Sequence, residues 1–113
     1  MISNKLFQYI CTLDQQACKQ LANTLNSKLD DVLLTGFPLS DSSANGYSKA
    51  IHLIRKLLLC DIDSREGILN EINELDLSYY QYNSCKSCFN DGFMRAVNQL
   101  GIEIENYNKS MLS

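Results

Sequence analysis

The residues between Tyr47 and Cys60 repeat their apolar side chains at the spacing of one helix face, and this pattern constrains the fold more than any other feature. The apolar positions fall within about 120° of one another at 100° per residue: Ala50, Ile51, Ile54, Leu57 and Leu58. A helix with one apolar face needs other elements to cover that face. We therefore expect a core-facing helix from Tyr47 to about Cys60.

A second stripe follows, and it predicts a helix from Arg65 to about Asn83. Its apolar face comprises Ile68, Ile72, Leu75, Tyr79 and Tyr82. Residues 61–64 separate this helix from the preceding one. Asp63 or Ser64 can cap it by accepting a hydrogen bond from a free backbone N–H group.

The first third of the chain predicts further helical segments. A helix is expected from Asn4 to Cys11, and Asp14 can cap a second stretch with apolar residues at helical spacing: Ala17, Cys18, Leu21, Ala22, Leu25 and Leu29. The pattern leaves open whether these form one helix or two. Residues 30–34 predict a short separate turn, and the polar, glycine-containing residues 36–46 predict a loop, with Pro38 unable to continue a helix.

The last long segment has one apolar face, formed by Cys85, Cys88, Phe89, Gly92, Phe93, Ala96 and Leu100. Gly92 and Ala96 lie four residues apart, so a neighbouring helix could approach them closely. Gly101 is a candidate helix end, yet the helical spacing continues through it, and both readings stay open. Sustained alternation of the kind found in strands is almost absent. We predict a single all-α domain over residues 1–113, a bundle of four to five helices.

The charge distribution disfavours an autonomous nucleic-acid-binding protein. The net charge is −3, whereas such proteins carry a basic excess that displaces counterions from phosphate. Residues 61–76 hold six acidic side chains and a single basic one, Arg65, which makes them an acidic block. A helix-turn-helix can still be drawn with residues 66–75 as its first helix and Tyr79 opening the reading helix, so a small transcriptional regulator is an alternative.

The number of cysteines and the composition of residues 1–10 predict the cellular compartment of the protein. Five cysteines are an odd number, and residues 1–10 lack the basic start and long apolar run of a signal peptide. Nor does any apolar run approach the roughly 18 residues of a membrane span. We expect a cytoplasmic protein with reduced thiols and no membrane association.

The most motif-like feature is Cys85-Lys-Ser-Cys88, because two thiols at this spacing can share a metal or form a redox disulfide. Cys60 is a further candidate ligand, so a metal or redox sensor is a second alternative. The competing interpretation is that both thiols pack in the core, where free cysteine is commonly buried. That interpretation is preferred, and no cofactor is expected.

Catalysis has little support, since His52 is the single histidine and no nucleophile arrangement accompanies it. Three surfaces could instead contact a partner protein. They are the tyrosine cluster around Tyr80, a basic ridge formed by Lys49, His52, Arg55, Lys56 and Leu59, and the acidic block with Glu71 and Glu74. We therefore expect a small interaction protein, acting as a regulator, adaptor or inhibitor. The two charged surfaces could also meet across a homodimer.

Overall fold

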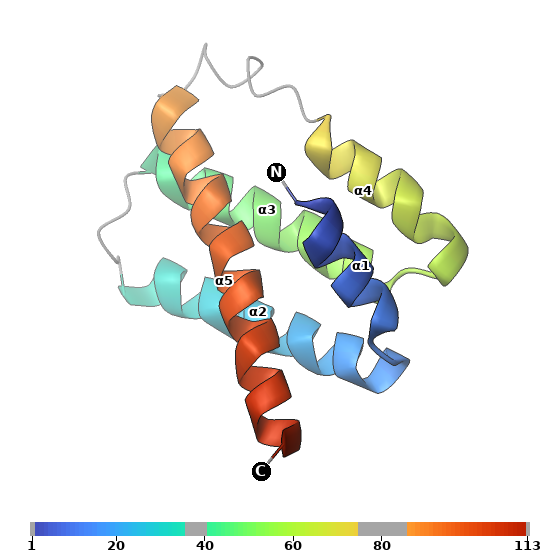
Figure 1. The fold of residues 1–113 in the computed structure, drawn as a ribbon. Coiled ribbons are helices and arrows are strands. Elements are labelled where there is room, and N and C mark those ends of the chain that lie inside the picture. Colours follow the sequence, from blue (N-terminus) through green and yellow to red (C-terminus); the bar gives the residue numbers. More distant parts are fainter. Residues whose placement is uncertain (1, 36–40, 75–85, 113) are drawn as a thin grey trace.

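All regular structure in the described part of the chain, residues 2–35, 41–74 and 86–112, is helical in the computed structural model (Figure 1). The elements are α1 (Asn4–Thr12), α2 (Gln15–Thr35), α3 (Asp41–Leu59), the 3₁₀ helix η1 (Ile62–Ser64), α4 (Arg65–Asn73) and α5 (Lys86–Leu112). The predicted all-α fold is confirmed. No helix within these residues is long and apolar enough to cross a membrane.

The N-terminal stretch forms two helices. Ser3 caps α1 by accepting a hydrogen bond from the N–H of Leu6, and the chain then extends at Leu13. The Asp14 carboxylate accepts a bond from the N–H of Ala17 at 2.7 Å, so the predicted cap of the second helix is confirmed. The separate turn predicted at residues 30–34 is wrong, because α2 continues to Thr35. Its buried Leu29 and partly buried Val32 pack on the core and hold this part of the helix in place.

Helix α3 begins at Asp41, six residues before the predicted start. The loop predicted for residues 36–46 is therefore wrong from Asp41 onward, and residues 36–40 lie outside the described part. The polar and small side chains that suggested a loop have a packing role. Ser43 is buried against α5, where its hydroxyl donates a hydrogen bond to the carbonyl of Cys88 at 2.9 Å.

Helices α3 and α5 cross at very short distance, as Figure 1 indicates near the start of both helices. A Cβ atom added at Gly46 would lie 2.0 Å from the carbonyl oxygen of Phe89, and one added at Gly92 would lie 1.9 Å from that of Ser43. Neither position has room for a side chain. The close approach predicted at Gly92 is confirmed, and Gly46 is its counterpart on α3.

Helix α3 lies at the centre of the bundle and packs against α2, α4 and α5. Every residue of its predicted apolar face is buried, and Leu53 is buried as well because three helices cover α3. Helix α5 runs through Gly101 without a break and contributes Phe89, Phe93, Ala96 and Leu100 to the core, as its apolar pattern predicted. One hydrophobic cluster joins residues from Ile2 to Ile104.

Helix α4 is shorter than predicted. It ends at Asn73, with the N–H of Glu74 bonded to the carbonyl of Asn70 at 2.8 Å, and residues 75–85 lie outside the described part. The Asn73 side chain exchanges two hydrogen bonds with the backbone of Ile2, which ties the N-terminus to this helix end. The capping predicted at Ser64 is wrong, because Ser64 precedes α4 but makes no side-chain capping bond. The N–H of Arg65, the first residue of α4, bonds instead to the carbonyl of Ile62 in η1.

Candidate partner-binding site

The predicted basic ridge lies along α3, with His52 and Lys56 exposed and Lys49 and Arg55 half-buried. Lys56 forms an ion pair within the chain, since its Nζ lies 3.3 Å from Oε2 of Glu71 on α4. The ridge and the acidic block thus meet within one chain. Both side chains of this pair are about half exposed, so it contributes little free energy.

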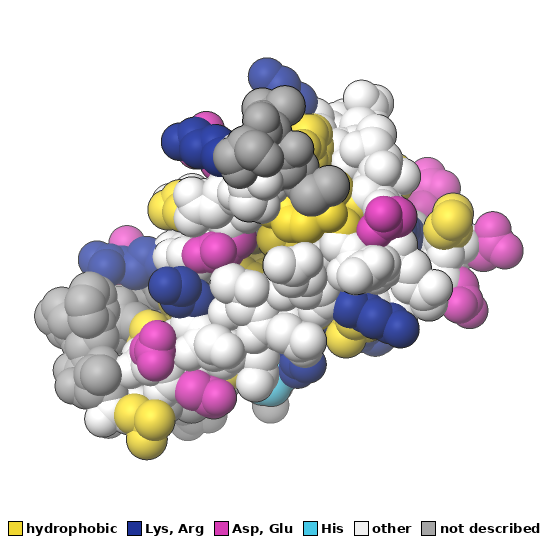
Figure 2. Space-filling view, turned by 90° about the horizontal axis from the view of Figure 1, so that it is seen from below, with side chains coloured by type: hydrophobic (Ala, Val, Ile, Leu, Met, Phe, Trp, Pro, Cys, Tyr) yellow, Lys and Arg dark blue, Asp and Glu magenta, His cyan; other side chains and the backbone are white. Residues whose placement is uncertain are grey.

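Charges of both signs alternate on the face shown in Figure 2, where basic and acidic side chains lie next to one another. Such a surface lacks the single-sign field that draws a protein onto nucleic acid. Of the other predicted contacts, Glu74 is exposed directly after α4, and Tyr80 lies outside the described residues.

Of the candidate metal ligands, the two that the structure describes, Cys60 and Cys88, are not brought together. Cys60 follows the C-terminal end of α3, and its thiol donates a hydrogen bond to the carbonyl of Leu57. The hydrogen bond from Ser43 places Cys88 at the opposite end of α3, about 25 Å away at the helical rise of 1.5 Å per residue. Cys85 lies outside the described residues. Within residues 2–35, 41–74 and 86–112, no three His, Cys, Asp or Glu side chains form a metal-binding group. Cys11, Cys18 and Cys60 are free thiols.

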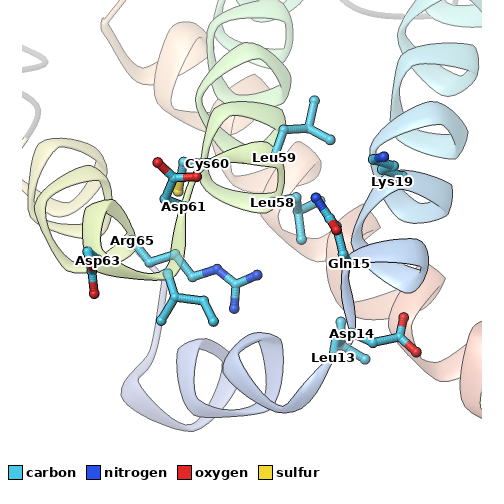
Figure 3. A pocket seen from close by; sticks show the side chains of 11 residues that line it. Leu13, Asp14, Gln15, Lys19, Leu58, Leu59, Cys60, Asp61, Asp63 and Arg65 are labelled. Atoms are coloured by element: carbon cyan, nitrogen blue, oxygen red, sulfur yellow. The ribbon is translucent and has the colours of Figure 1, made fainter.

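The structure reveals a pocket that no sequence pattern indicated. It has a volume of about 380 Å³ and lies where the α1–α2 turn faces the end of α3, η1 and the first residue of α4 (Figure 3). Leu13 and Leu58 form part of its apolar wall. Leu59 and Ile62 also line it, although their side chains are 49% and 77% exposed to solvent. The pocket therefore has an apolar rim that the described part of the chain leaves exposed.

Arg65 lies deep in this pocket with only 6% of its surface exposed. Its Nη1 and Nη2 atoms make long contacts of 3.5 Å each, to the carbonyl of Ile10 and the sulfur of Cys18. The Nε atom is buried without a hydrogen-bond partner. No carboxylate of the described residues pairs with this guanidinium, whereas Arg95 pairs with Asp91 at 3.0 Å. A buried cation without a counter-charge destabilises the fold.

The neighbouring thiol does not supply the missing negative charge. Burial raises the pKa of Cys18 above its ordinary value of 9.0, and the attraction of Arg65 for the thiolate opposes this rise only in part. At neutral pH Cys18 is therefore protonated and accepts only a weak bond from the guanidinium.

Three carboxylates surround the pocket, but they do not neutralise Arg65 either. Asp14 is committed to capping α2. In Figure 3 the carboxylates of Asp14 and Asp63 point away from the guanidinium. Among the described residues, no ion pair joins Asp61 to Arg65. Lys19 is the second cation at the pocket. The arrangement is a buried positive charge beneath an apolar rim, with acidic groups further out.

Sequence reasoning missed Arg65, although two signals mark it. It precedes Ile68 by three residues and Ile72 by seven, so it shares their apolar face. It is also the first residue of α4, where the helix dipole disfavours a cation. Together these signals indicate an arginine held in place for its charge.

Comparisons of the chain with protein-family models, curated proteins and solved structures give no match. The function is therefore argued from the pocket alone. Its residues can contact an apolar group at the rim and a negatively charged group at Arg65, so the pocket is suited to binding a ligand that carries both groups.

Proposed function

We propose that this chain is a small cytoplasmic interaction protein that binds a partner protein through the pocket and catalyses no reaction of its own. The chain would act as a regulator, adaptor or inhibitor by occupying the surface of that partner. The observation that carries the proposal is the exposure of Leu59 and Ile62 at the edge of one cavity. The free thiols fit a reducing compartment.

Covering an exposed apolar side chain is favourable because it removes apolar surface from water. Adjacent exposed apolar groups therefore commonly mark protein interaction sites. Leu59 and Ile62 are three residues apart and border the same cavity. Its volume of about 380 Å³ is in the size range of pockets that bind specific groups. A partner side chain that entered the cavity would place its own backbone over both residues.

The site differs from the three surfaces expected from sequence, yet it touches two of them. Leu59 belongs to the basic ridge, while Asp61 and Asp63 begin the acidic block. The pocket lies where these surfaces meet. Its partner is therefore expected to combine an apolar anchor with polar groups at the rim, as protein interfaces do.

Selection of peptides from a random display library against the purified protein tests the proposal. Selected peptides are then measured on a double variant of the rim, Leu59→Asp with Ile62→Asp. The matched control, Leu34→Asp with Ile102→Asp, changes two exposed apolar residues that do not line the pocket. All four positions are exposed, so neither double variant should unfold the bundle.

We expect peptides that bind the wild-type and control proteins alike and lose at least about tenfold in affinity on the rim variant, since a buried carboxylate at either rim position is costly. A selection that yields only peptides indifferent to the rim variant, or no peptides at all, would contradict the proposal.

A further inference from the structure

We infer that the group entering the pocket is a single carboxylate, carried by an apolar segment of the partner, and that it pairs with Arg65. This inference rests on the proposed function and names the chemistry of the bound group. It explains why the chain keeps a charged side chain in a position that hydrophobic packing would otherwise fill.

In the unbound protein Arg65 is buried and weakly bonded. Arg65 has only 6% of its surface exposed, and it lines the cavity. Its two hydrogen bonds, at 3.5 Å, are at the long limit for such contacts, and its Nε has no partner. Removing a charge from water costs free energy that only a well-placed counter-charge recovers. A ligand that brings this counter-charge gains more from Arg65 than it would at the surface.

The planar guanidinium of Arg65 favours a ligand of matching shape. A guanidinium is planar and presents its N–H groups in a fork that matches the two oxygens of a carboxylate. The weak contacts to the carbonyl of Ile10 and the thiol of Cys18 can be exchanged for shorter, charge-assisted ones. Leu13 and Leu58 line the same pocket as Arg65 and favour a carboxylate attached to an aliphatic chain.

The charges around the cavity favour a ligand with a single negative charge. Asp14, Asp61 and Asp63 border the same cavity and outnumber the two cations, Lys19 and Arg65. A dianionic phosphate would be repelled by these carboxylates at the mouth. A single carboxylate meets less repulsion and can be fully covered at Arg65. The source is either an Asp or Glu side chain or the carboxyl terminus of the partner.

Peptides selected on the wild-type protein provide the probes. In one series Glu is replaced by Gln and Asp by Asn; in a second series the terminal carboxylate is made an amide. Each peptide is titrated against the wild-type protein, Arg65→Met and the control Arg95→Met, which removes an exposed arginine of α5. Methionine keeps most of the side-chain volume and adds no charge.

We expect one of the two series to lose at least about tenfold in affinity on the wild-type protein and on Arg95→Met, and to lose nothing further on Arg65→Met. The series that responds identifies the source of the carboxylate. Inorganic phosphate at millimolar concentration should not displace the peptide.

Rim-dependent peptides that bind equally as acids and amides would overturn the carboxylate inference and leave the proposed function standing. If Arg65→Met fails to fold, the peptide series on the wild-type protein still decide. If no rim-dependent peptide is found, the proposed function fails, and 4-methylpentanoate is titrated against its amide. Binding of the acid alone supports the carboxylate site, and absence of binding rejects it.

Discussion

Replacing Gly92 by alanine tests the closest contact in the bundle. The new Cβ would lie 1.9 Å from the carbonyl oxygen of Ser43. Carbon and oxygen atoms approach to about 3.3 Å at closest, so α3 and α5 would have to separate by more than an ångström. That separation would stretch the hydrogen bond from Ser43 to Cys88 and loosen the packing of Phe89 and Phe93.

The expected magnitude follows from three contributions. Overpacking a core costs about 1–3 kcal/mol, and weakening the Ser43 bond costs about 1 kcal/mol more. Alanine returns up to about 1 kcal/mol through its higher helix propensity. The free energy of unfolding should therefore fall by about 2 kcal/mol for Gly92→Ala, and by a similar amount for Gly46→Ala, whose Cβ would lie 2.0 Å from Phe89.

Two other helical glycines provide matched controls. A Cβ added at Gly67 or Gly101 meets no atom within 4 Å, so alanine there should stabilise the protein by about 0.5–1 kcal/mol. Urea denaturation followed by far-ultraviolet circular dichroism measures all four variants. If Gly92→Ala and Gly101→Ala unfold at the same urea concentration, the close crossing of α3 and α5 is refuted.

Three further predictions concern capping, pH and assembly. Asp14→Ala should lower the free energy of unfolding by about 1 kcal/mol, while Ser64→Ala, which removes no capping bond, should leave it unchanged in the same urea titration. Burial raises the pKa of Cys18 in the folded state above its ordinary value of 9.0, so the thiol of the unfolded chain ionises first as the pH rises. The contribution of this group to the free energy of unfolding is therefore fully present below pH 9.0 and is lost above it. Cys18→Ala should weaken that loss in denaturation series from neutral to alkaline pH. Sedimentation at micromolar concentration should give about twice the 12.8 kDa chain mass if the chain forms a homodimer, and a strictly monomeric profile would reject the homodimer.

The sequence predicted the elements whose apolar residues follow a single clean period. The face of α3 from Ala50 to Leu58 and the face of α5 from Phe89 to Leu100 are both buried as expected. It also predicted the Asp14 cap, which depends on residues three apart in the chain. Each of these features is decided by local spacing.

Apart from the close approach at Gly92, the features decided by contacts between distant segments were not predicted. Residues 41–46 read as a loop because Ser, Asn and Gly have low helix propensity, yet Ser43 and Gly46 serve the crossing with α5. Arg65 shares the apolar face of Ile68 and Ile72, but its pocket was not predicted, since that pocket is built from the α1–α2 turn and the end of α3. The contact between Lys56 and Glu71 also required the fold, because it joins two helices.

The central claim, that Arg65 receives the carboxylate of a partner, is tested most directly by the nuclear magnetic resonance signal of its Nε–H group. In the free protein this nitrogen is buried and without a partner. Saturation with a selected peptide should shift the Arg65 signal strongly downfield, while that of Arg95, which already bonds Asp91, stays in place. An Arg65 signal that does not move when the peptide is fully bound would contradict the account.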